Sequence, residues 1–171
     1  MSHASYRSPL ADRYASPAML ELWSLQTRHG LWRRLWLALA ETQRDLGVAI
    51  PADALTQMRA HLDDIDFDKV AEYEKRFRHD VMAHIHAFGD VAPAAKGVIH
   101  LGATSCFVTD NGDLIQMRRG LELLRARLVS VIRALSTFAR QWRDEPALGY
   151  THLQPAPLTT VGKRAPLGLQ D

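Results

Sequence analysis

The longest regular pattern in the sequence runs from Asp110 to Arg143 and reads DNGDLIQMRRGLELLRARLVSVIRALSTFARQWR. Its apolar residues recur at alternating steps of three and four, and they are Leu114, Met117, Leu121, Leu124, Leu128, Val131, Leu135, Phe138 and Trp142. This spacing over four heptads predicts one continuous α-helix with an apolar seam. At 1.5 Å per residue, such a helix is roughly 50 Å long.

The apolar stripe is wider than a two-stranded seam, because Ile115, Leu123, Ile132 and Ala139 add to it. A stripe of this width needs neighbouring helices on more than one side. No other predicted helix is long enough to cover it, and each uncovered Leu would forgo roughly 1.5–3 kcal/mol of burial. We therefore expect its partners to come from further sequence of a larger helical-bundle protein or from other subunits. The alternative is a helix that packs on residues 1–100 alone and frays at its far end.

Capping and terminating residues predict the helices before the seam. They are expected over residues 17 to about 30, 31–46, 51–62 and 67–88, with a loop and a brief helical or extended piece over 91–105. Gly30 is expected to end or bend the first helix, and Gly47 to terminate the second. After the seam, Pro155 and Pro157 predict a stiff non-helical loop, and Thr159-Thr160 is suited to cap a short helix that starts near residue 161.

The composition is that of a globular protein, with 171 residues, 47% hydrophobic and 23% charged. The formal net charge is only +2, so the chain lacks the strong positive potential that would favour nucleic-acid binding. The longest apolar run has six residues, Leu35–Ala40, where a membrane span needs about 20. Without a recognisable leader, a cytoplasmic protein is expected. The single Cys106 excludes an internal disulfide and a multi-cysteine metal site.

The eight histidines raise the question of a metal site. On a continuous helix, His79 and His84 diverge by about 140°, and His79 and His86 lie about 10 Å apart along the axis. A metal ion binds histidine nitrogens at about 2 Å, so neither pair of side chains can bind the same ion. The sequence also has no HExxH motif. We expect neither a metal nor another cofactor.

Three short segments carry side chains suited to chemistry. Arg78-His79-Asp80 joins a cation, an imidazole and a carboxylate, although a surface charge cluster has the same composition. Thr104-Ser105 follows Gly102 in a turn suited to bind a carboxylate or phosphate. An ordinary capped helix start would have the same residues. The third segment, 151–154, places His152 in a proline-stiffened loop, where catalytic imidazoles are often found.

Four segments together resemble the adenylosuccinate lyase family in their order and spacing. They are SPLADRYAS at 8–16, KRFRHDVMAH at 75–84, HLGATS at 100–105 and THLQPA at 151–156. The resemblance covers residues 6–165. The last two motifs are shared across the fumarase/aspartase superfamily, whereas the first two point to the adenylosuccinate branch.

The resemblance implies an all-α homotetramer with a central bundle of long helices. Residues 1–104 would form an N-terminal helical domain, and residues 105–171 the first long helix and the start of the bundle. The implied reaction is the β-elimination of fumarate from adenylosuccinate, which leaves AMP, and from the succinylated aminoimidazole carboxamide ribotide of purine synthesis. The implied partners are therefore a small nucleotide substrate and other copies of the chain.

The resemblance also implies roles for single residues. Those for binding are Arg13 and Tyr14 at the nucleotide phosphate, Arg78 and Asp80 in the nucleotide pocket, Thr104 and Ser105 at the succinyl carboxylates, and Thr151 and Gln154 as further contacts. His152 is implied as the general acid that protonates the departing nitrogen. His79 is implied as a second catalytic residue that also lines the nucleotide pocket. Arginines and helix-start amides suit a substrate that carries a phosphate and two carboxylates.

The sequence departs from the family at the catalytic base. The family places this serine in a GSSxMPxKxN loop, and no serine of the chain precedes Met-Pro. We therefore expect this chain to be an N-terminal portion that is inactive alone. The last residues also depart from the family, because Pro166 and Gly168 disfavour the helix that the family begins at these positions. The alternatives are another lyase of the superfamily, acting on argininosuccinate or an adipate-like substrate, and a helical scaffold without catalysis. A nucleic-acid-binding module is a more distant alternative.

Overall fold

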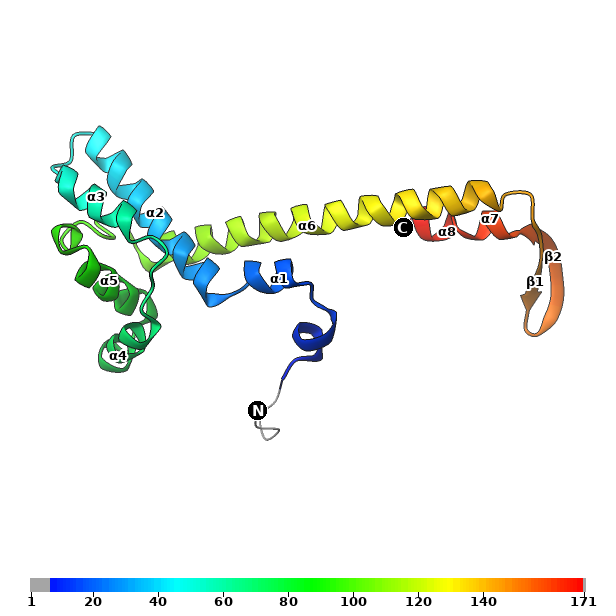
Figure 1. The fold of residues 1–171 in the computed structure, drawn as a ribbon, viewed down its shortest axis with the longest axis horizontal. Coiled ribbons are helices and arrows are strands. Elements are labelled where there is room, and N and C mark those ends of the chain that lie inside the picture. The colour runs from blue at the N-terminus through cyan, green and yellow to red at the C-terminus, as the bar shows by residue number, and fades with distance from the viewer. Residues whose placement is uncertain (1–6, 171) are drawn as a thin grey trace. The chain divides into compact units, whose positions relative to one another are not determined.

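The computed structural model describes residues 7–170, so the first six residues of the expected N-terminal domain lie outside it. Its elements are η1 (Leu10–Tyr14), α1 (Pro17–Leu22), α2 (Leu25–Asp45), α3 (Ala52–Ala60), α4 (Phe67–Phe77), α5 (Asp80–Val91), η2 (Pro93–Ala95), α6 (Ser105–Gln141), β1 (Pro146–Thr151), β2 (Gln154–Thr160), α7 (Val161–Arg164) and α8 (Leu167–Gln170) (Figure 1). The predicted all-α class is confirmed, with one antiparallel two-stranded sheet added. No helix within the described residues is both long and apolar enough to span a membrane.

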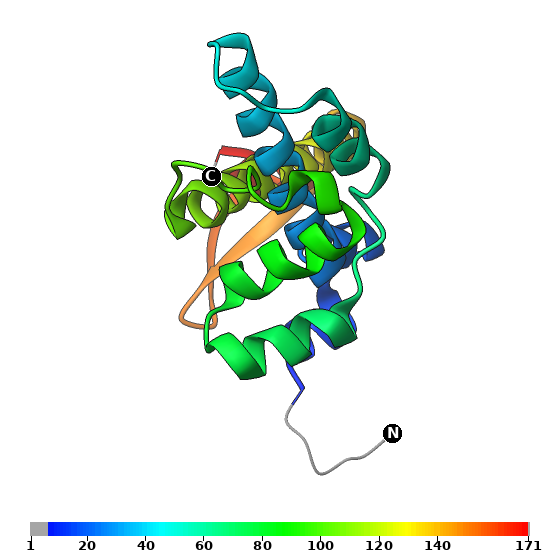
Figure 2. The ribbon, with the colours of Figure 1, turned by 90° about the vertical axis from the view of Figure 1, so that its left-hand side faces the viewer.

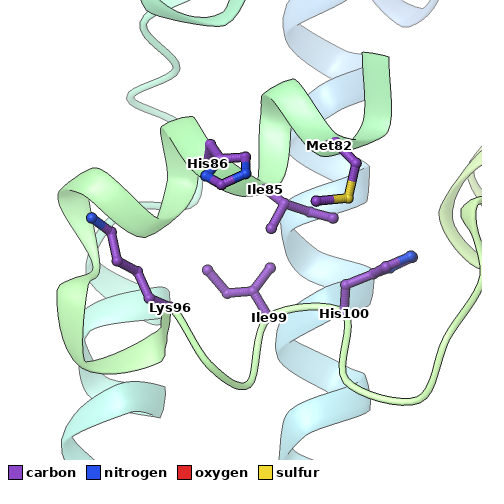
Figure 3. Close-up of a pocket in the computed structure, with 6 residues that line it drawn as sticks. All are labelled: Met82, Ile85, His86, Lys96, Ile99 and His100. Atoms are coloured by element: carbon purple, nitrogen blue, oxygen red, sulfur yellow. The ribbon is translucent and has the colours of Figure 1, made fainter. Parts of the chain in front are cut away.

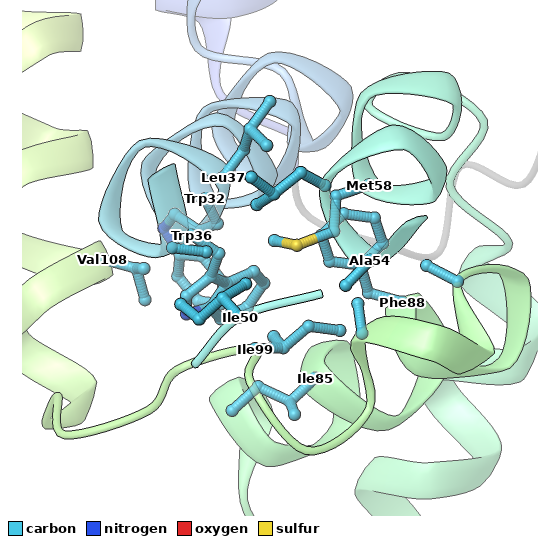
Figure 4. Close-up of a cluster of buried hydrophobic side chains, with 14 of the residues drawn as sticks. Trp32, Trp36, Leu37, Ile50, Ala54, Met58, Ile85, Phe88, Ile99 and Val108 are labelled. Carbon is cyan, nitrogen blue, oxygen red and sulfur yellow. The ribbon is translucent and has the colours of Figure 1, made fainter. Parts of the chain in front are cut away.

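The chain forms two compact units, Met1–Gly120 and Leu121–Asp171, and the division falls inside α6. The core of the first unit gathers side chains from α2, α3, α5, the loop before α6 and the first turns of α6 (Figure 4). Its largest members include Trp32, Trp36, Leu55, Met58 and Phe88. Helices α4 and α5 lie side by side within the same unit (Figures 1 and 2).

Helix α6 confirms the long helix that the seam predicts. The residues by which its first turns pack into the first unit recur every four positions: Val108, Gly112, Gln116 and Gly120. Gly112 faces Trp32, and Gln116 donates from Nε2 to the Leu22 carbonyl oxygen at 2.6 Å. The predicted seam lies on a different part of the helix surface, because Leu114, Leu121 and Leu128 are 58%, 67% and 60% exposed.

The predicted boundary at Gly30 is wrong, because this glycine lies buried inside α2. The break falls earlier, where the Ser24 hydroxyl caps α2 by accepting the Thr27 N–H. A Cβ at position 30 would lie 3.1 Å from the Arg34 guanidinium, so glycine provides room for a close approach rather than a helix end. Gly47, in contrast, follows α2 with φ +93° and confirms the predicted left-handed terminator.

The second unit contains the rest of α6, the β1–β2 hairpin, α7 and α8. The non-helical segment that the prolines predict is confirmed, and it forms paired strands. The Thr160 hydroxyl caps α7 by accepting the Lys163 N–H, as expected. Gly162 lets α7 approach α6 closely, because a Cβ there would lie 2.6 Å from the Arg143 backbone.

Candidate active site

The Arg78-His79-Asp80 triplet lies at a break between α4 and α5. The sequence predicts a single helix over about 67–88, and this prediction is wrong, because α4 and α5 are separate helices. Arg78 adopts the left-handed conformation at φ 56° and ends α4, with its N–H donating to the Glu74 carbonyl oxygen at 2.8 Å. His79 then caps α5, because its Nδ1 accepts the Met82 N–H at 3.4 Å. The chain therefore turns sharply at the triplet and exposes it.

Asp80 begins α5, where its carboxylate lies at the positive end of the helix dipole. Its Oδ1 accepts the Val81 N–H at 2.8 Å and lies 3.5 Å from Nδ1 of His79. Arg78 lines an open depression with Ala71, Glu74 and Lys75.

The second segment forms the start of α6. His100 and Gly102 both have positive φ, +67° and +68°, and the Ala103 N–H donates to the His100 carbonyl oxygen. This tight turn delivers Thr104 to the helix start, where its carbonyl oxygen accepts the Phe107 N–H at 3.0 Å. Ser105 is the first residue of a 37-residue helix, whose N-terminus favours anionic groups.

The structure brings these two segments together. His79 Nε2 and the Ser105 hydroxyl oxygen lie 3.4 Å apart, although 26 positions separate them in the sequence. Because Nδ1 accepts the Met82 N–H, the proton of a neutral imidazole resides on Nε2 and points at the serine oxygen. The serine hydroxyl proton remains available for an acceptor on a ligand.

His100 joins this group and was not singled out by the sequence analysis. Its Nδ1 accepts the Trp36 indole N–H at 2.9 Å, and burial together with the charge of nearby His79 lowers the pKa of His100. The available signal was its place two residues before Gly102 in HLGATS. Its hydrogen-bond partner, 64 positions away, gave no sequence signal.

A cavity of about 290 Å³ adjoins His100, between α5 and the loop before α6 (Figure 3). Its lining residues are Met82, Ile85, His86, Lys96, Ile99 and His100. Lys96 pairs with Asp90 at 3.1 Å, and His86 stacks on Phe77 with ring centroids 4.5 Å apart. Lys96 and His86 are therefore both in contact with side chains of α5 and α4, respectively.

Arg13 and Tyr14 end the short helix η1 and are exposed, Tyr14 by 75%. Within residues 7–170, neither is hydrogen-bonded or ion-paired to another predicted site residue. The structure of the chain therefore does not join this pair to His79 and Ser105.

His152 lies at the tip of the β1–β2 hairpin in the second unit. Thr151 and Gln154 pair across a two-residue turn, and His152 and Leu153 both have positive φ, 49° and 61°. This is the pattern of a type I′ turn, which usually contains Asn or Gly. Such conformations of bulkier residues are found preferentially at functional sites. The hairpin thus presents an exposed imidazole at its tip.

Histidines also occur in the core, where His29 stacks on His84 with ring centroids 3.9 Å apart. Burial, followed by the charge of Arg28, lowers the pKa of His29 to about 4, and burial, followed by His29, lowers the pKa of His84 to about 3. Both side chains are therefore neutral near pH 7. Among the described residues, no three His, Cys, Asp or Glu side chains gather closely enough to hold a metal ion.

Solved structures define the class of this fold. A 3-carboxy-cis,cis-muconate lactonizing enzyme from Pseudomonas putida matches with a TM-score of 0.84 and 30% identity, over 95% of this chain and 38% of its own. A fumarate lyase from Mesorhizobium sp. BNC1 matches with a TM-score of 0.80 and 31% identity, over 91% of this chain and 37% of its own. The fold is that of the fumarase/aspartase-type lyases.

The sequence is similar to a particular member of this class. Adenylosuccinate lyase from Saccharomyces cerevisiae is 50% identical over 98% of this chain. The chain spans 35% of the length of that enzyme, and no protein-family model matches it. In sequence and fold, the chain is a relative of adenylosuccinate lyase, as the four motifs predict.

Proposed function

We propose that this chain supplies part of the active site of an adenylosuccinate lyase. The enzyme would eliminate fumarate from adenylosuccinate, giving AMP, and from the succinylated aminoimidazole carboxamide ribotide. The observation that carries this proposal is the approach of His79 to Ser105 at 3.4 Å, because it unites two of the family's motifs in one polar site. The 50% identity to the yeast enzyme supports the same reaction.

The proposed binding roles follow the chemistry of the side chains. Thr104 and Ser105, at the N-terminus of α6, would bind the succinyl carboxylates, since free amides and hydroxyls there donate to anions. The other residues proposed to bind substrate are Arg13 and Tyr14 at the phosphate, Arg78 and Asp80 around the nucleotide, and Thr151 and Gln154 beside the reacting centre. His79 would orient the Ser105 hydroxyl through its Nε2–H.

His152 is the proposed general acid. In the β-elimination a base removes a proton from carbon, the electron pair forms the double bond of fumarate, and the carbon–nitrogen bond breaks. The departing nitrogen then takes a proton from the imidazole. No residue of the chain is placed in the role of the base, so we expect the 171 residues alone to lack activity. The reaction needs no cofactor.

We further propose that α6 mediates self-association, in a homotetramer when the whole protein is present. Leu114, Leu121 and Leu128 lie along one apolar seam and are more than half exposed. A bundle of such helices would bury them. Residues 1–104 and 105–171 are proposed as the domain division of that cytoplasmic enzyme.

The test is a substrate comparison with the complete protein that contains this chain. We expect fumarate release from adenylosuccinate and from the succinylated ribotide, and none from argininosuccinate. Protection against heat by AMP, with no protection by fumarate alone, would support the purine assignment. Cleavage of argininosuccinate instead would assign the protein to another branch, and no cleavage or ligand binding would favour a scaffold.

A further inference from the structure

Two side chains of α2 hold the loop that leads into the candidate site. The Trp36 indole N–H donates to Nδ1 of His100 at 2.9 Å, and Nε2 of Gln43 donates to the Leu101 carbonyl oxygen at 2.8 Å. Trp36 and Gln43 lie two helical turns apart on one face of α2. The loop is therefore fixed at two consecutive residues, which lie three to five positions before Thr104 and Ser105.

The Trp36 hydrogen bond determines more than the position of the loop. An indole N–H is only a donor, so its partner Nδ1 must be unprotonated. The single proton of the neutral ring then resides on Nε2. A ring flip would place a carbon against the indole N–H, and Trp36 is 0% exposed, so no water could replace the lost acceptor. The two rings meet edge to face at 90°.

We propose that Trp36 is a positioning residue that holds His100 as the neutral Nε2–H tautomer, so that His100 donates a hydrogen bond to an anionic oxygen of the bound ligand. The identity of the ligand rests on the proposed function, whereas the tautomer rests on the Trp36 contact alone. His79 is held in the same form, because its Nδ1 accepts the Met82 N–H. The site would thus read a carboxylate or phosphate with the Nε2–H of His100 and with the Ser105 hydroxyl, which the Nε2–H of His79 orients.

The surroundings of His100 oppose its protonation. Burial is the larger cause that lowers the pKa of His100, and the charge of His79 is the smaller one. His86 and Lys96 line the same cavity, where Lys96 is paired with Asp90. Protonation of Nδ1 would also bring two donors face to face at the Trp36 contact. The neutral donor form is therefore maintained by burial as well as by the indole.

The first test is nitrogen-15 NMR of the histidine rings in the 171-residue chain, comparing wild type, Trp36→Phe and Gln43→Met. Phenylalanine keeps most of the ring volume and removes only the indole donor, whereas Gln43→Met removes the other anchor of the loop. We expect wild type and Gln43→Met to show the Nε2–H tautomer. Trp36→Phe should raise the proton affinity of His100 roughly fivefold, the size of one lost hydrogen bond, and populate the Nδ1–H form.

A wild-type measurement keeps the proposal testable if Trp36→Phe fails to fold. The Trp36 indole proton shift should follow the same titration curve as His100, because protonation breaks their bond. A proton on Nδ1 in the wild type, an indole signal that ignores the titration, or equal proton affinities in a folded Trp36→Phe and in Gln43→Met would each overturn the positioning role.

The second test adds AMP with fumarate to the complete protein. A shift of the His100 Nε2–H signal supports the donor role, and bound ligands that leave this signal unmoved overturn it. Failure to bind either ligand overturns the proposed function and the ligand half of the inference with it. The tautomer measurement still decides the role of Trp36 in that case, so the two failures are distinguishable.

Discussion

Nε2 of His79 lies 3.4 Å from the Ser105 hydroxyl oxygen, and Nδ1 of the same ring caps helix α5. One imidazole therefore joins the start of α5 to the start of α6. Nδ1 has a structural role at the start of α5, and Nε2 faces the candidate site. Variants at position 79 can test these two roles separately.

The capping role predicts a stability effect at position 79. His79→Ala removes the acceptor for the Met82 N–H and should lower the free energy of unfolding by about 0.5–2 kcal/mol. His79→Asn supplies another capping acceptor and should recover most of this loss. Urea denaturation of the chain measures both, and equal losses for Ala and Asn would contradict the capping role.

The stacked pair His29 and His84 predicts acid sensitivity. Their pKa values, about 4 and about 3 when folded, lie below the ordinary value of 6.5, so the unfolded state binds more protons between these limits. The free energy of unfolding is therefore highest above pH 6.5, where both histidines are neutral in either state. It decreases as the pH falls below 6.5 toward 4 and 3. The slope should approach about 1.4–2.7 kcal/mol per pH unit, for one to two protons.

Urea denaturation at pH 7 and pH 5 measures this slope. His84→Leu should flatten the pH dependence, whereas His152→Gln, on the exposed hairpin, should leave it unchanged. A slope that survives the loss of His84 would place the acid sensitivity elsewhere in the chain.

Two adjacent arginines should differ sharply in their contribution to stability. Arg33 is 2% exposed, bonds to the His61 carbonyl oxygen and Asp64, and lies over the Phe88 ring at 4.6 Å. Arg33→Ala should cost about 2–4 kcal/mol, because it opens a cavity and leaves polar partners unsatisfied. Arg34→Ala breaks an exposed pair with Asp63 and a hydrogen bond to the Gly30 carbonyl oxygen, and it should cost only about 1 kcal/mol. Similar thermal shifts for the two variants would refute this difference.

The close approach of α7 to α6 predicts that Gly162 cannot carry a side chain. Gly162→Ala would force a methyl group against the Arg143 backbone and should break the bond from the Gly162 N–H to the Trp142 carbonyl oxygen. Gly168→Ala is the matched control, since nothing lies within 4 Å of its Cβ position. Hydrogen exchange of the α7 amides should accelerate in the first variant only. Unchanged protection in both would show that the contact does not hold α7.

Long-range periodicity made α6 predictable, because its alternating steps continue over nine apolar positions. The α4–α5 break was not predictable in the same way. A histidine is an unusual cap, and Arg78 in the left-handed conformation carries no glycine signal. Pro155 and Pro157 correctly predicted a non-helical segment. They did not predict that it forms paired strands, because pairing depends on residues on the other side of the turn.

The candidate site was predictable as motifs but not as geometry. The sequence indicated the Arg78–Asp80 and Thr104–Ser105 segments separately, and only the fold shows that His79 approaches Ser105. His100 required knowledge of Trp36, a buried residue 64 positions away. Residues that act through long-range hydrogen bonds are the ones that local pattern cannot reveal.

We propose that the His79–Ser105 cluster and His152 serve one elimination reaction. Its most direct measurement is the rate of fumarate release from adenylosuccinate by the complete protein, in wild type, Ser105→Ala, His152→Ala and the surface control Thr56→Ala. We expect His152→Ala to lose at least about a hundredfold, Ser105→Ala to lose activity clearly, and the control to match wild type. Wild-type rates in both site variants would contradict the account.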